Sequence, residues 1–350
     1  MATSNNEPHG IAWEARQAGL FRHTPLIYSA PLSKLCQNDV YLKLDCLQAS
    51  GSFKDRGMAH LCWDLKQQGC NKLISSSGGN AGLAVATTGQ QLGMTVQVIV
   101  PQTTKPMVVD KLKSLGAQVT VFGENWNAAD QLARQKVEED TAASYISPYD
   151  NPLLWTGHST LIDEITEDLK AQQKENFQGI GTLLVSVGGG GLLCGVLEGL
   201  ERQKVSTDDE ATKKTKIIAV ETAGTASFSK ALAKGELVRL ESIDSIATSL
   251  GALEVTQATL DRSHAAQQST TVSAVCTDAQ AVHACVSLAQ DHRLLVEPAC
   301  GAALAVAYSE DLRNEFLKNT EVEGPIVIEV CGGSGVNLDL LAQWKQEFLA

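Results

Sequence analysis

Residues 73–93 read LISSSGGNAGLAVATTGQQLG, and this stretch predicts the class of fold. The apolar run 73–76 is typical of a short strand, and it ends in a cluster of serines and glycines. The segment 81–93 then has the pattern of a helix that stops at a glycine. A strand that leads through a short loop into a helix is the repeating unit of a parallel sheet.

The same alternation continues directly along the chain. The pattern predicts strands over 95–101 and 117–123, and helices over 105–116 and 125–140. The connections between them are only a few residues long. This βαβαβα series therefore favours an open parallel sheet.

Strands that end in glycine loops return in the second half of the chain. GTLLVSVGGGG (181–191) and GPIVIEVCGGSG (324–335) each predict a strand followed by such a loop, and TKIIAVE (215–221) predicts another strand. PYDNPLLW (148–155) indicates a crossing between two lobes, and the polar segment 202–216 indicates a solvated connector. We predict an α/β fold with two open, twisted, mostly parallel sheets flanked by helices.

Length and charge limit what the protein can do. At 350 residues the chain holds either one large core or two lobes with a cleft. Its net charge of −12 argues against nucleic-acid and membrane-surface roles, because it repels phosphate backbones and anionic lipid. No apolar run reaches the roughly 18 residues of a membrane span, and the N-terminus is unlike a signal peptide. The nine cysteines contain no CxxC pair, so we expect reduced thiols and a cytoplasmic protein.

The four consecutive glycines of SVGGGGLLCG (186–195) predict a phosphate site. Without Cβ atoms, successive N–H groups can converge on one anion, and the following helix adds its positive end. No Lys-Ser/Thr pair follows, so this is no Walker loop, and a GxGxxG loop with an acidic ribose ligand does not fit either. The alternative is a tight strand–helix turn, which rarely needs four glycines.

Two further loops at strand ends indicate that several ligand groups meet in one crevice. In SSSGGNAG the hydroxyls of Ser76 and Ser77 and the amide of Asn80 could hold an anion such as a carboxylate. The alternative for this loop is an ordinary helix N-cap. Cys331 opens the third loop, CGGSG (331–335), and is alternatively a buried apolar thiol. In open α/β sheets ligands bind beyond the carboxyl ends of the strands, where all three loops fall.

Lys54 stands among small residues in ASGSFKDRG (49–57), directly after Phe53. A surface lysine needs no such neighbours, whereas a lysine that approaches a planar ligand needs the room. A desolvated lysine has a lowered pKa and can form a Schiff base. The cofactor that combines a phosphate, a planar ring and a lysine Schiff base is pyridoxal 5′-phosphate, and we predict that cofactor.

These motifs, in this order, resemble the fold-type II pyridoxal-phosphate enzymes, the tryptophan synthase β-like family. HTPL (23–26) is similar to the opening segment of that family. EPACGAALA (297–305) and NPLLWTGHS (151–159) resemble the eukaryotic L-serine dehydratase/L-threonine deaminase group, the serine ammonia-lyases, in particular. The resemblance covers nearly the whole chain.

The resemblance implies two domains and a role for each motif. Residues 1–47 and 151–350 would form a large cofactor-binding and catalytic domain, and 48–150 a small domain, with the cofactor in the cleft between them. Lys54 and Ser77 are the catalytic candidates. The cofactor-binding residues would be Phe53 against the ring, Lys54, Asn80 at the ring hydroxyl, Gly188, Gly189, Gly190, Gly191 and Leu192 at the phosphate, and Cys331 at the pyridine nitrogen. The substrate carboxylate would lie among Ser77, Gly78, Gly79 and Ala81.

Related enzymes bind a potassium-like monovalent cation, and the resemblance places its ligands here too. They would be Glu221 and the carbonyls of Thr225, Leu250 and Ala252. Glu221 is alternatively an ordinary strand-end carboxylate. The resemblance further implies a homodimer, and a catabolic role such as gluconeogenesis is the natural expectation.

The implied reaction is β-elimination from L-serine to pyruvate and ammonia, and from L-threonine to 2-oxobutanoate and ammonia. A serine racemase or a β-replacement enzyme of the same fold is the alternative, although racemases of the family resemble a version with histidine where this chain has Ala81. A non-catalytic relative and a nicotinamide-dependent oxidoreductase are the competing classes. Gly78 is alanine in several family members, which leaves the preference between serine and threonine open.

Overall fold

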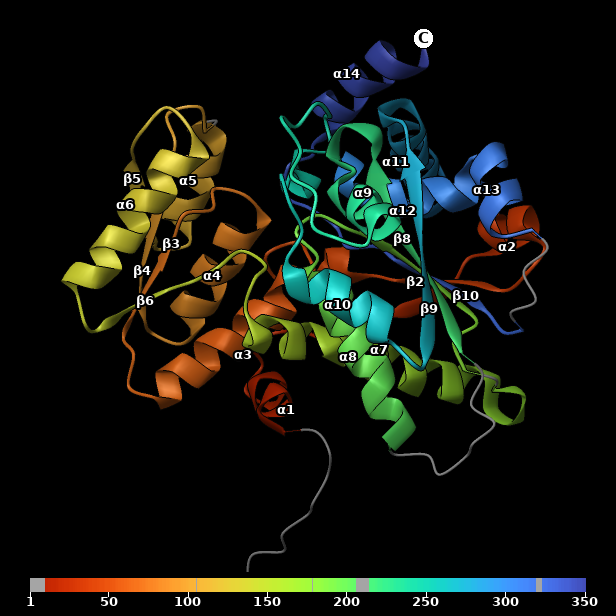
Figure 1. Ribbon diagram of the computed structural model, residues 1–350, viewed down its shortest axis with the longest axis horizontal. Coiled ribbons are helices and arrows are strands. Elements are labelled where there is room, and N and C mark those ends of the chain that lie inside the picture. The colour runs from red at the N-terminus through yellow and green to blue at the C-terminus, as the bar shows by residue number, and fades with distance from the viewer. Residues whose placement is uncertain (1–9, 105, 178, 206–213, 319–322) are drawn as a thin grey trace, which may run out of the picture.

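The computed structural model describes residues 10–104, 106–177, 179–205, 214–318 and 323–350, and its strands form two sheets. Figure 1 shows the four-stranded sheet, in orange and yellow, beside the larger sheet and the helices around it. The predicted α/β fold with two mostly parallel sheets is confirmed.

The four-stranded sheet is entirely parallel and has the strand order β5-β4-β3-β6. Three of its strands and the three helices that follow them confirm the predicted alternation. They are β3 (Lys72–Ser75), α4 (Asn80–Gln91), β4 (Thr95–Val100), α5 (Pro106–Ser114), β5 (Gln118–Val121) and α6 (Trp126–Glu139). The prediction lacks β6 (Ala143–Tyr145), because three residues are too few to show a period. All four strands fall within 48–150, but the domain boundaries themselves stay a prediction.

The six-stranded sheet has the order β1-β2-β10-β7-β8-β9, and only its β1–β2 pair is antiparallel. Its strands are β1 (Leu26–Tyr28), β2 (Val40–Lys43), β7 (Thr182–Ser186), β8 (Thr215–Thr222), β9 (Ser269–Cys276) and β10 (Ile326–Glu329). The central strands β7 and β10 are buried at every residue, which explains their unbroken apolar pattern. Apolar cores cover both faces of this sheet.

Helices surround the larger sheet and connect it to the smaller one (Figure 1). They are α1 (Gly10–Gln17), α2 (Ala30–Cys36), α3 (Lys54–Gln67), α7 (Pro152–Gln173), α8 (Gly191–Val205), α9 (Ser227–Lys234), α10 (Gln257–Ala265), α11 (Asp278–His292), α12 (Pro298–Tyr308), α13 (Glu310–Phe316) and α14 (Leu338–Leu349). Helices α3 and α7 cross closely at Gly57 and Gly157. A Cβ on Gly57 would lie 2.6 Å from the His158 ring, so only glycine allows this approach.

The bounds of two predicted connecting segments need correction. Residues 148–151 lie between β6 of the small sheet and α7, but from Pro152 onward PYDNPLLW is the first turn of α7, because the Asn151 side chain accepts from the Leu153 N–H and caps the helix. In the polar segment 202–216, both ends belong to regular elements, α8 and β8, and residues 206–213 lie outside the described residues. In the described ranges no helix has the length and hydrophobicity to cross a membrane, and all nine cysteines are free thiols.

A buried ion cluster joins α3 to the larger sheet and to α7. The guanidinium of Arg56 donates to Asp45 at 2.6 and 2.7 Å and to Glu164 at 2.9 and 2.7 Å. Lys43 binds Glu164 at 2.8 Å. Burial alone would raise the pKa of Glu164, but the charges and hydrogen bonds of Arg56 and Lys43 outweigh burial and hold that pKa at about 2. All four charges are fully buried, so each depends on its partners.

Replacing Arg56 with methionine is therefore expected to destabilise the protein by about 3–5 kcal/mol, because it leaves the buried carboxylate of Asp45 without its cation and Glu164 with Lys43 alone. The urea midpoint measures this loss. The matched control is Arg134→Met, whose side chain is 58% exposed and pairs with Asp130, and which should cost about 0–1 kcal/mol. Equal losses in the two variants would contradict the structural role of the cluster.

Candidate active site

Lys54 is the first residue of α3, and backbone hydrogen bonds tie the loop before it to the CGGSG loop. The Phe53 N–H donates to the Cys331 carbonyl at 3.1 Å, and the Gly333 N–H donates to the Gly51 carbonyl at 2.9 Å. Because β10 ends directly before this second loop, the pairing places Lys54 at the carboxyl edge of the six-stranded sheet. The structure thus brings two motifs together that lie almost 280 residues apart, as the difference between 331 and 54 shows.

The Lys54 amine is half-buried and donates to the Pro148 carbonyl at 2.6 Å. Its Nζ lies 4.9 Å from the centre of the Phe53 ring. Burial lowers the pKa of Lys54 to about 8, although the nearby Cys331 opposes the shift. A substantial fraction of the amine is therefore neutral near pH 8, and only the neutral amine is a nucleophile or a base.

The glycine run 188–191 leads from β7 into α8, and Gly189, Gly190 and Gly191 are packed too tightly for a side chain. A Cβ on Gly189 would overlap the Tyr149 ring, and one on Gly190 would overlap the Thr259 hydroxyl. Gly190 also has a φ of +94°, which disfavours other residues. The loop therefore keeps its backbone bare beside the start of a helix, as a phosphate cradle requires. Leu192, the second residue of α8, is buried.

The serine loop after β3 agrees only in part with its prediction. The prediction for Ser76 is wrong, because its buried hydroxyl donates to Asp130 at 2.6 Å and is used inside the small sheet. Ser77 is half-buried, and its hydroxyl accepts from the Gly79 N–H at 3.3 Å. The side chain of Ala81 packs in the apolar core, so only its backbone could face a ligand. Gly78 and Gly79 lie between them at the start of α4.

Asn80 is the point where this loop meets the CGGSG loop. Its Nδ2 donates to Glu297 at 2.8 Å, and its Oδ1 accepts from the Ser334 N–H at 3.0 Å. The sequence analysis does not identify Glu297 as a site residue. Glu297 opens the motif EPACGAALA, and nothing in that motif shows which residues it contacts. Cys331 is buried, and a hydrogen bond with Cys300 and burial raise its pKa well above the usual range. Cys331 is therefore a neutral thiol.

Glu221 is buried at the carboxyl end of β8, where its oxygens accept from the N–H groups of Phe228 at 2.8 Å and Ser229 at 2.7 Å. Burial raises its pKa to about 7 against these hydrogen bonds. Leu250 packs against the phosphate loop, since a Cβ on Gly188 would lie 3.2 Å from its Cα. The described ranges hold no cluster of three or more His, Cys, Asp or Glu residues that could bind a metal, so a cation here would depend on carbonyls.

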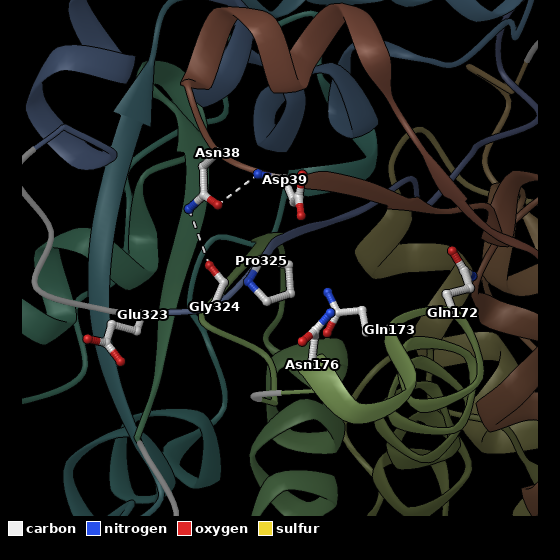
Figure 2. Close-up of a pocket in the computed structure, with 8 residues that line it drawn as sticks. All are labelled: Asn38, Asp39, Gln172, Gln173, Asn176, Glu323, Gly324 and Pro325. Carbon is white, nitrogen blue, oxygen red and sulfur yellow. Dashed lines mark hydrogen bonds between the residues drawn. The ribbon is translucent and has the colours of Figure 1, made fainter.

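A separate cavity of about 740 Å³ lies at the opposite edge of the large sheet, before β2 and β10 begin. Asn38 lines this cavity, and its side chain donates to the Gly324 carbonyl at 3.2 Å (Figure 2). Its lining includes none of the predicted site residues. It is distinct from the carboxyl edge of this sheet, where Lys54 lies beside the CGGSG loop and Asn80 of the serine loop contacts Ser334.

The arrangement fits pyridoxal 5′-phosphate on structural grounds: a bare glycine loop before a helix, a lysine with lowered pKa, and a neutral thiol, all at the carboxyl edge of the large sheet. The fold and this site define the class of fold-type II pyridoxal-phosphate enzymes. The chain belongs to the pyridoxal-phosphate dependent enzyme family, which it matches over residues 18–332.

Curated relatives and a solved structure agree with this assignment. The chain is 42% identical over 334 residues to a protein of Mus musculus named L-serine dehydratase/L-threonine deaminase, with 95% of this chain and 97% of the relative covered. It is 38% identical to a protein of Rattus norvegicus named serine dehydratase-like, with 93% and 94% covered. The structure of an L-serine ammonia-lyase from Rhizomucor miehei superimposes with a TM-score of 0.83 at 33% identity, covering 94% of this chain and 99% of that chain.

The tight packing of the phosphate loop gives a direct test. Gly190→Ala is expected to weaken pyridoxal-phosphate binding by roughly ten-fold or more, because its Cβ overlaps Thr259 and shifts the loop. Titration of the cofactor by absorbance measures the affinity. Gly235→Ala is the matched control, since Gly235 also has a positive φ of +74° but has open space around it. Unchanged affinity in Gly190→Ala would contradict the placement of the phosphate.

Proposed function

We propose that this enzyme eliminates water from L-serine to give pyruvate and ammonia, and acts on L-threonine to give 2-oxobutanoate and ammonia. The observation that carries the proposal is the half-buried Lys54, with a pKa of about 8, at the junction of the glycine loops. The names of the relatives and of the similar structure support the same reaction. The bound cofactor supplies an electron sink for the substrate, and the protein supplies position and proton transfer.

The roles of the side chains follow from their places. The neutral amine of Lys54 holds the cofactor and removes the proton from the substrate Cα. Gly188–Gly191 and Leu192 bind the phosphate through backbone N–H groups at the start of α8. Phe53 packs against the ring and Asn80 donates to the ring oxygen. The loop of Ser77, Gly78, Gly79 and Ala81 binds the substrate carboxylate at the start of α4.

Two residues adapt this site to elimination. Cys331 faces the pyridine nitrogen as a neutral thiol, which cannot hold a proton there as an aspartate would. A weaker electron sink suits a reaction in which the leaving group departs promptly. Gly78 lets the loop proposed for the substrate carboxylate approach Val100 and Thr104, because a Cβ there would lie only 3.1 Å and 3.3 Å from their side chains.

We also propose a monovalent cation, such as potassium, at Glu221 with the carbonyls of Thr225, Leu250 and Ala252. The contact between Leu250 and Gly188 supports the proposal, because a cation there would stiffen the phosphate loop. We further propose that the protein is a cytoplasmic homodimer. We propose that it acts in amino-acid catabolism and gluconeogenesis.

Lys54→Ala tests the reaction. Loss of the base and of the cofactor attachment should lower pyruvate formation from L-serine by at least about 10²–10⁴-fold. A coupled lactate dehydrogenase assay measures pyruvate. Lys66→Ala on the same helix, whose amine bonds Asn71 near the surface, is the control and should keep the wild-type rate. A Lys54→Ala variant that still forms pyruvate at the wild-type rate would refute the proposed role.

The cation site predicts a pH-dependent effect on stability. The pKa of Glu221 rises from 4.5 to about 7 on folding, so its ionisation penalises the folded protein as pH rises through this interval. A cation compensates the ionised form only. Potassium should therefore raise the melting temperature more at pH 8 than at pH 6, and Glu221→Gln should abolish the difference. An equal shift in wild type and variant would exclude Glu221 as the ligand.

A further inference from the structure

Glu297 is a buried carboxyl group for which the proposed reaction has no use. It directly precedes α12 and is 7% exposed. Its side chain does not cap its own helix, so the usual reason for an acidic residue at this place is absent. Burial raises the pKa of Glu297, while hydrogen bonds from Ser249 and Asn80 oppose that shift. A carboxyl group kept in such surroundings costs free energy, which its contacts must offset.

Two loops of the crevice close around this carboxyl group. Oε1 accepts from Asn80 Nδ2 at 2.8 Å, and Oε2 accepts from the Gly335 N–H at 3.2 Å. A Cβ on Gly333 would overlap the carboxyl carbon, and one on Gly335 would lie 3.0 Å from Oε2. The glycines of the CGGSG loop therefore make room for Glu297, and the contact to Asn80 joins this loop to the small sheet.

The remaining contacts of Asn80 determine how its amide can act. Its Oδ1 accepts from both the N–H of Ser334, at 3.0 Å, and its hydroxyl, at 3.1 Å. A carbonyl oxygen has two lone pairs, and both are now used. One of the two Nδ2 hydrogens points to Glu297. The amide orientation is fixed from both ends, and a single N–H remains for a ligand.

We propose that Glu297 is a positioning residue that restricts Asn80 to donating toward the ring oxygen of the cofactor, and thereby favours the cofactor with that oxygen deprotonated. An amide free to rotate could turn its oxygen toward the ligand and accept from a protonated ring hydroxyl instead. Glu297 prevents this, because its carboxylate only accepts hydrogen bonds and must face Nδ2. The inference rests on the proposed function for the cofactor, and not on the identity of the amino-acid substrate.

The test is the visible spectrum of the holoenzyme, since the deprotonated and protonated ring forms absorb in different bands. Glu297→Gln keeps the shape of the side chain but adds a donor that can face Asn80. The ratio of the two bands should shift toward the protonated form by roughly ten-fold, and the ratio should become dependent on pH. Ser334→Ala, which removes one donor to Asn80, should shift the ratio in the same direction by less.

Glu201→Gln is the matched control. Glu201 lies in the second half of α8, away from the glycine loop, and its carboxylate accepts from the N–H groups of Gln267 at 2.9 Å and Gln268 at 3.2 Å. Its substitution should leave the band ratio unchanged. Wild-type ratios in both Glu297→Gln and Ser334→Ala would overturn the inference, as would an equal shift in Glu201→Gln.

The same samples separate this inference from the proposed reaction. If the ratio shifts as expected but wild type forms no pyruvate from L-serine, the positioning role stands and the proposed substrate is wrong. If wild type forms pyruvate and the ratio does not shift, the reaction stands and the role of Glu297 is wrong. If wild type shows no cofactor band after addition of pyridoxal phosphate, both are wrong.

Discussion

The site depends on the ion pairs of the buried Arg56 guanidinium with Asp45 and Glu164. Arg56 lies two residues after Lys54 and binds Asp45, just beyond β2, and Glu164 on α7. Because its five N–H donors have fixed directions, the pairs set both the place and the rotation of the first turn of α3. Lys54 begins that turn, so the ion cluster determines where the reactive amine stands relative to the sheet.

Near Arg56 and Lys54, glycines allow two loops of the candidate site to pack closely against their neighbours. The glycine loop 188–191 packs against Tyr149 and Thr259, and the CGGSG loop packs against Glu297, at distances that a Cβ would not permit. Each loop follows a parallel strand, and parallel strands end at one edge of a sheet. The fold thus gathers Lys54, a bare glycine loop and the start of α4 from distant parts of the chain. Burial then tunes the chemistry by lowering the pKa of Lys54.

The sequence predicts those features whose residues leave few alternatives. Four successive glycines after an apolar strand indicate a phosphate cradle, and the alternation over 73–140 indicates a parallel sheet. Features that depend on contacts between residues far apart in the chain cannot be predicted from the sequence. Ser76 and Ser77 are adjacent and chemically alike, yet only the position of Asp130 shows that Ser76 is used inside the sheet. Arg56 carries no sign of burial, because charged residues are mostly exposed. The amide geometry of Asn80 requires the contacts of Glu297 and Ser334.

We propose that Lys54, among the 19 lysines of the chain, is the residue that holds the cofactor. Borohydride reduction of the purified holoenzyme, followed by peptide mass spectrometry, tests it most directly, because reduction makes the attachment permanent. We expect one phosphopyridoxyl group, on the peptide that contains Lys54. A label on another lysine, such as Lys43 or Lys111, or no label in an enzyme that has bound pyridoxal phosphate, would contradict it.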